Sequence, residues 1–105
     1  MSDRLRKTFD LYGSPLALET ALREAEAALG ISFEPHESSY RGGDYYRSSE
    51  SFILQRNAEL DDELAEPEFP NAATVLYVSQ VADPDVIRKQ LVATGSFNHL
   101  RREQA

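Results

Sequence analysis

The most reactive side chains of this chain are two histidines, His36 and His99, and the serines that follow the first of them. A zinc site on a helix uses the pattern H-E-x-x-H, which this sequence lacks. Ser38 and Ser39 lie close to His36 and Glu37, but neighbouring residues of a strand point to opposite faces, and no G-x-S-x-G elbow is present. The residues therefore favour a protein that is not an enzyme. An enzyme using His36, Glu37 or a pair of carboxylates is the least favoured alternative.

Carboxylates form the densest chemical cluster of the sequence. The acidic segment, residues 59–70, reads ELDDELAEPEFP and contains no Lys or Arg; its carboxylates belong to Glu59, Asp61, Asp62, Glu63, Glu66 and Glu68. These carboxylates account for −6 of the net charge of −7, which leaves −1 for the rest of the chain. A local charge of this size complements a basic partner. An EF-hand loop needs a central Gly, which the segment lacks, so we expect neither a metal site nor a cofactor.

A second cluster, residues 40–47, reads YRGGDYYR and combines aromatic rings with guanidinium groups, the types enriched where proteins recognise one another. The candidate contact residues outside the six carboxylates are Tyr40, Arg41, Asp44, Tyr45, Tyr46 and, from the acidic segment, Phe69. Two alternatives stay open. The tyrosines can belong to the core, and Arg41, Arg47 and Arg56 can neutralise the acidic segment within the molecule.

Composition restricts the class of protein. A chain of 105 residues with 41% hydrophobic residues can bury one core, so we expect a single domain over 1–105. The absence of Cys excludes disulfide and thiolate chemistry, and no signal peptide or membrane span is evident, which favours a cytoplasmic protein. The net charge of −7 repels a phosphate backbone, so we expect no nucleic-acid partner, and the lack of a membrane-length apolar stretch predicts no membrane partner. Arg101 and Arg102, near the chain end, are expected to be solvated.

Two segments have the pattern of amphipathic helices. Apolar residues recur every three or four positions over 15–29, with Ser14-Pro15 as a start signal and Gly30 as a stop. The pair Asp83-Pro84 repeats the start signal for a second helix, which Gly95 ends.

Four segments have the pattern of strands. Residues 31–37 alternate, and Pro35 limits them to an edge or a strand end. Residues 38–48 and 50–57 predict a hairpin turning at Ser48-Ser49, in which the pair Gly42-Gly43 forms either a turn tip or a bulge. The last strand, within 73–81, is apolar on both faces and is expected inside the sheet.

Together these elements predict the α+β class: an antiparallel sheet of about four strands with two helices on one face, in the order α-β-β-β-β-α. Residues 1–12 and 96–105 are expected to be flexible. The acidic segment becomes a long connection, over 58–72, between the third strand and the central one, and its order without a partner is not predictable.

The stretches FEPHESSYRGGDYYR, ILQRN and EPEFP resemble small bacterial immunity proteins, the cytoplasmic antidotes encoded beside contact-dependent or other polymorphic toxins. The resemblance covers the middle of the chain, from Phe33 to about Val78. It implies a small domain that binds its cognate toxin tightly and blocks the toxin's active site or substrate entry, and it assigns no role to any individual residue.

The sequence therefore predicts an immunity or antitoxin protein, preferably monomeric, that occludes a basic, nuclease-type toxin domain. Charge would speed the encounter, and aromatic side chains would anchor the complex. The alternative is a small non-enzymatic binding module or subunit in which the acidic segment only increases solubility.

Overall fold

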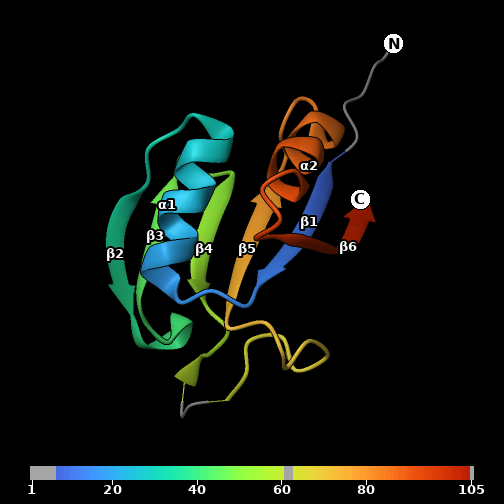
Figure 1. Ribbon diagram of the computed structural model, residues 1–105. Coiled ribbons are helices and arrows are strands. Elements are labelled where there is room, and N and C mark those ends of the chain that lie inside the picture. Colours follow the sequence, from blue (N-terminus) through green and yellow to red (C-terminus); the bar gives the residue numbers. More distant parts are fainter. Residues whose placement is uncertain (1–6, 61–62, 105) are drawn as a thin grey trace.

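Within residues 7–60 and 63–104, which the computed structural model describes, six strands form one antiparallel sheet and two helices cover one of its faces (Figure 1). The strands are β1 (Thr8–Ser14), β2 (Glu34–Ser38), β3 (Gly43–Ser48), β4 (Phe52–Arg56), β5 (Thr74–Ser79) and β6 (Asn98–Gln104). The helices are α1 (Leu18–Leu29) and α2 (Pro84–Val92), and a 3-10 turn covers Ser39–Arg41. The strand order in the sheet is β2-β3-β4-β5-β1-β6. The predicted α+β class, antiparallel sheet and two helices are confirmed.

The predicted number of strands and the order of elements are wrong. The chain order is β-α-β-β-β-β-α-β, because β1 and β6 form where residues 1–12 and 96–105 were expected to be flexible. β1 lies between β5 and β6, and its residues Leu11 and Tyr12 are buried. Residues 1–6 and 105 lie outside the described part of the chain.

α1 follows the predicted pattern but begins later than expected. Leu18, Ala21 and Ala25 are buried against the sheet, and Gly30 ends the helix in the left-handed conformation, with φ of 66°. The predicted cap is wrong, because Ser14 is the last residue of β1 and its Oγ accepts a hydrogen bond from the Leu16 amide at 3.1 Å.

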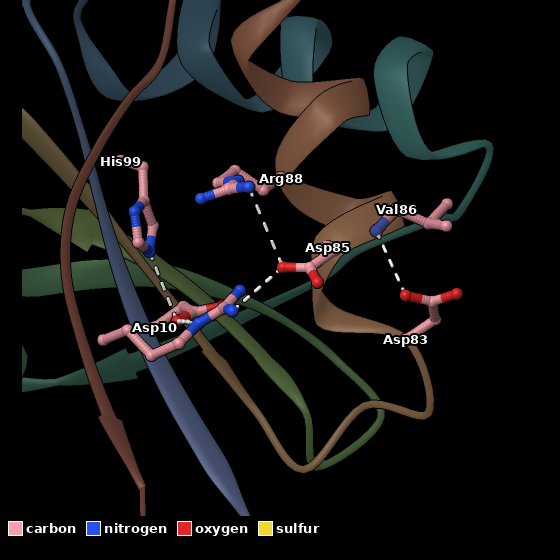
Figure 2. Close-up of polar contacts among 7 residues, drawn as sticks. Asp10, Asp83, Asp85, Val86, Arg88 and His99 are labelled. Carbon is pink, nitrogen blue, oxygen red and sulfur yellow. Dashed lines mark hydrogen bonds and ion pairs between the residues drawn. The ribbon is translucent and has the colours of Figure 1, made fainter.

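α2 begins as predicted. The Asp83 carboxylate accepts a hydrogen bond from the Val86 amide at 3.3 Å, which caps the first turn (Figure 2). Pro84 occupies the first helical position. The helix ends at Val92, before the predicted stop at Gly95. Within the described residues no helix is long and apolar enough to cross a bilayer.

The predicted hairpin is present and resolves the alternatives for the glycine pair. β3 and β4 are adjacent and antiparallel, and the turn between them places Ser49 at φ of 53°. Gly42, with φ of 77°, ends the 3-10 turn that joins β2 to β3, so the pair forms a turn tip. A Cβ at Gly42 would lie 2.9 Å from the Ala58 carbonyl oxygen, so only Gly fits there.

The sheet divides the molecule into two faces. The core beneath the helices contains Tyr12, Leu18, Ala21, Ala25, Phe33, Phe52, Leu54, Leu76, Val78, Leu91 and Phe97. Because Leu76 and Val78 face the helices, their neighbour Tyr77 projects from the opposite face. β5 lies between β4 and β1, which confirms its predicted place inside the sheet.

Candidate functional site

The acidic segment is divided between carboxylates engaged within the molecule and carboxylates that are not. The Tyr77 hydroxyl donates to Glu66 Oε2 at 2.7 Å, and Arg101 Nη2 donates to Glu66 Oε1 at 3.1 Å. Arg101 Nη1 also lies 3.4 Å from Glu68 Oε1. The Glu66 side chain is only 14% exposed, whereas that of Glu68 is 73% exposed. Glu66 therefore holds the connection against the sheet face opposite the helices.

Asn57 fixes the backbone of the same connection. Its Nδ2 donates to the carbonyl oxygens of Phe69 and Ala72, both at 3.0 Å, and its Oδ1 accepts from the Glu66 amide at 2.8 Å. Asn57 is 5% exposed, so these bonds replace the water that its amide group loses on burial. Phe69, predicted as a contact residue, thus stabilises the fold through its carbonyl oxygen, which accepts a hydrogen bond from Asn57. Asn57 is not among the predicted site residues, although an Asn directly after a strand is a frequent turn residue.

Glu59 and Glu63 behave differently from Glu66. Both are exposed, and within the described ranges their side chains form no ion pair or hydrogen bond. The Glu59 amide donates to the Glu63 carbonyl oxygen at 2.7 Å, so the two residues are held beside each other. Asp61 and Asp62, also predicted as contact residues, lie outside the described residues.

Tyr40 lies beside the carboxylates of Glu59 and Glu63. Its side chain is 72% exposed, and it lines an open hollow of about 370 Å³ together with Glu59, Leu60 and Glu63, which we name the Tyr40 hollow. Ser38 Oγ accepts a hydrogen bond from the Tyr40 amide at 3.2 Å, which fixes the start of the turn that carries the ring. The two segments that the sequence analysis selected therefore meet at one place.

The other aromatic candidates point elsewhere. The Tyr45 ring stacks on His36, with centroids 5.4 Å apart, and the Arg41 guanidinium lies 5.4 Å from its centroid. Arg41 Nη1 donates to Gln55 Oε1 at 2.8 Å, and Gln55 is 2% exposed. Tyr46 packs against the core, as its alternative assignment held, and Asp44 is exposed on the same strand.

Within the described residues, the acidic segment is partly neutralised inside the molecule, but by Arg101, which was expected to be solvated, and not by Arg41, Arg47 or Arg56. Arg47 donates to the Ser49 carbonyl oxygen and Arg56 to that of Gly42, at 3.2 and 3.5 Å. Arg101 pairs with the segment instead, because β6 carries it beside Tyr77 on the same face of the sheet. The expectation that Arg101 and Arg102 are solvated is thus wrong.

A buried ion-pair cluster, which the sequence analysis did not predict, lies beneath α2 (Figure 2). The Asp10 side chain, 1% exposed, accepts from Arg102 Nε at 2.7 Å and from Nη2 at 3.0 Å. His99 Nε2 lies 3.3 Å from Asp10 Oδ1, and Arg102 Nη1 donates to Asp85 Oδ1 at 2.9 Å. Arg88 lies 3.9 Å from the same Asp85 oxygen. The hydrogen bonds that Arg102 donates to Asp10 and Asp85 raise the pKa of Arg102, and the bond from Arg102 lowers the pKa of Asp85.

This ion-pair cluster connects elements far apart in the sequence. Asp10 comes from β1, Arg102 from β6 and Asp85 from α2, so their contacts hold the helix on the sheet. No group of three or more His, Cys, Asp or Glu side chains in the described part of the chain is arranged to hold a metal ion. With its carboxylate bound by a bidentate guanidinium, Asp10 has the geometry of a structural residue.

The comparison with known proteins assigns no family, since the chain matches no family model and a search of the curated proteins finds no similar sequence.

The Tyr77–Glu66 hydrogen bond predicts an alkaline loss of stability. Burial, followed by the hydrogen bond to Glu66, raises the pKa of Tyr77 above its usual value of 10.0. The folded state therefore keeps this phenol protonated where the unfolded chain ionises it, so its contribution is complete below pH 10.0 and falls as the pH rises above that value. We expect urea unfolding to show a smaller loss of stability between about pH 8 and about pH 11 for Tyr77→Phe than for the wild type.

A matched control tests whether this loss is specific. Tyr40→Phe removes an exposed hydroxyl, so we expect this variant to retain the wild-type loss. Burial and the nearby Asp10 also raise the pKa of Tyr12, to about 12, so part of the alkaline loss remains in Tyr77→Phe. An unchanged pH dependence in Tyr77→Phe would contradict the assignment.

Proposed function

We propose that the protein is a cytoplasmic immunity protein of the antitoxin type, which binds a basic, nuclease-type toxin domain and blocks its active site. It acts as a non-enzymatic, monomeric inhibitor. The proposal unites the resemblance of residues 33–78 to bacterial immunity proteins with the chemistry of the Tyr40 hollow.

The observation that carries the proposal is the meeting of Tyr40 with Glu59 and Glu63 at an open hollow of about 370 Å³. Tyr40 and Leu60 supply exposed apolar surface, 72% and 46% exposed, and the carboxylates supply charge without a partner among the described side chains. This combination suits a Lys or Arg side chain, whose methylene stem packs on apolar surface while its charged end meets the carboxylates.

The interaction energies expected at the Tyr40 hollow depend on whether a partner excludes water from it. An ion pair between solvated groups contributes about 0.2 to 1 kcal/mol, and a cation over an exposed aromatic ring contributes about 0.5 to 1 kcal/mol. Exclusion of water by a partner strengthens both, and close charge pairs at interfaces reach about 1.5 to 7 kcal/mol. The Tyr40 hollow therefore gains affinity when a large surface covers it.

The alternative role, a binding module with a solubilising acidic segment, draws support from Glu66 and Glu68. These two carboxylates pair with Arg101 and hold the connection in place, which is a structural use of acidic charge. Exposed carboxylates such as Glu59 and Glu63 also increase solubility, but solubility alone does not require them to lie beside the exposed ring of Tyr40.

Co-expression with the product of the neighbouring gene tests the proposed function. We expect the tagged protein to co-purify with a basic toxin domain in a one-to-one complex and to abolish the toxin's activity in a cell-free assay. Co-purification with a housekeeping enzyme whose activity persists would favour the alternative.

A further inference from the structure

The two edges of the sheet are not equivalent. β2, at one edge, has five residues, includes Pro35 and is exposed along most of its length. β6, at the other edge, has seven residues and contains no proline. Natural sheets usually protect an open edge with proline, with charged side chains or with a covering segment, because unpaired backbone groups recruit another strand.

Backbone hydrogen bonds determine which residues face outward at each edge. The Thr8 carbonyl oxygen accepts from the amide of Gln80, the residue directly after β5, and this pair continues the β1–β5 register, so even-numbered residues of β1 face β5 and odd-numbered ones face β6. Leu11 therefore exchanges hydrogen bonds with Arg101, its partner in β6. It follows that the backbone of Arg102 points away from β1, toward the side of β6 on which no strand pairs within the described residues.

The same alternation explains the protection of β2. The Ser79 amide donates to the Ser51 carbonyl oxygen, so the backbone groups of odd-numbered residues in β5 and β4 bond to each other. Even-numbered residues of β4 then bond to β3, and odd-numbered residues of β3 bond to β2. His36, the partner of Tyr45, therefore directs its backbone groups inward, toward β3. Pro35 is then an outward residue, with no amide hydrogen to offer. Proline thus interrupts the edge at β2, whereas β6 has no proline and is regular from Arg101 onward, past the register shift opposite Leu11 and Tyr12.

The charged side chains of β6 do not shield its edge. Arg101 is bound to Glu66 on one face of the sheet, and Arg102 to Asp10 on the other. Exposed carboxylates flank the edge on both faces: Glu68 and Glu103, 73% and 67% exposed, accompany Arg101, while Asp85, 61% exposed, accompanies Arg102. With Arg88, which lies 3.9 Å from Asp85, three guanidinium groups meet five carboxylates here, those of Glu66, Glu68, Glu103, Asp10 and Asp85, so the border of β6 is acidic.

We propose that β6 accepts an extended basic segment of a partner protein as a seventh strand. Backbone hydrogen bonds to Arg102 supply the attachment, and basic side chains, which alternate between the faces of the added strand, meet Glu68 and Glu103 on one face and Asp85 on the other. A second copy of this chain is a poorer occupant, because its own β6 border repeats the same negative charge. The proposal does not depend on the Tyr40 hollow, which lies on other elements.

Amide hydrogen exchange with a synthetic peptide tests this proposal. The probe is a capped nonapeptide, TKRVTKRVT, whose basic residues fall on both faces of a strand. At about ten times its dissociation constant, we expect the Arg102 amide to exchange about tenfold more slowly, because only the unbound fraction exposes it. The Arg101 amide, already bonded to Leu11, should change less.

Two controls make the result decisive. A peptide with Glu in place of each Lys and Arg should give no protection, and the variant Glu68→Lys/Glu103→Lys should weaken the effect of the basic peptide. The variant Glu59→Lys/Glu63→Lys should retain it, which separates this edge from the Tyr40 hollow. Equal protection by both peptides, protection along β2 instead, or protection that rises with protein concentration alone would overturn the proposal.

Discussion

Replacement of Arg102 by Met is expected to destabilise the fold by about 3 to 5 kcal/mol, the usual cost of removing one partner from a buried ion pair. The substitution leaves the Asp10 carboxylate, 1% exposed, without its bidentate partner, and it also removes the contact between β6 and Asp85 of α2. Within its ion-pair cluster, Asp10 then has only the longer contact with His99 at 3.3 Å. Urea unfolding followed by circular dichroism measures the loss.

Arg88→Met provides the matched control for this prediction. Arg88 is 45% exposed and lies 3.9 Å from Asp85, so its removal should cost at most about 1 kcal/mol. The double variant Asp10→Asn/Arg102→Met should recover part of the stability, because it no longer buries an unpaired charge. If Arg102→Met were no more destabilising than Arg88→Met, the buried pair would not hold the terminal strands as we infer.

The elements that could be predicted from the sequence are those with local signals. The apolar residues of α1 recur every three or four positions, and Gly30 ends the helix. The cap of α2, Asp83, accepts a hydrogen bond from an amide only three residues away. The hairpin of β3 and β4 needs only a short turn at Ser49. Each of these signals acts between residues close in the chain, so a short window of sequence contains it.

β1 and β6 could not be predicted because their stabilising partners are distant in the sequence. Asp10 and Arg102 each indicate a solvated end when considered alone, and only the fold brings the two charges together. The same reason explains the candidate site. Both the acidic segment and the aromatic cluster could be identified from the sequence. Which carboxylates are structural could not, because Glu66 and Glu68 pair with the distant Arg101, whereas Glu59 and Glu63 lie beside Tyr40.

Reversal of charge at the Tyr40 hollow should have the largest effect on binding. We expect Glu59→Lys/Glu63→Lys to slow association with the basic partner identified by co-expression by about ten- to a hundredfold at low salt, because the local field that steers the encounter changes sign. The dependence of the rate on salt should weaken or reverse. Both residues are exposed and no side-chain hydrogen bond of theirs is present in the described ranges, so thermal unfolding should stay near that of the wild type.

Two further variants distinguish local recognition from net charge and from anchoring. Glu19→Lys/Glu50→Lys makes the same change in charge at exposed positions on α1 and in the β3–β4 turn, and it should slow association much less. Tyr40→Ala leaves the charge unchanged, so it should act mainly on dissociation, and a central aromatic anchor would cost about 2 kcal/mol or more of binding free energy. Stopped-flow association and dissociation rates at low and physiological salt measure all three variants. Equal slowing by the two charge reversals would show that the partner senses only the total charge, and the Tyr40 hollow would then lose its assigned role, because an interface centred on it must respond to its own carboxylates more strongly than to distant ones.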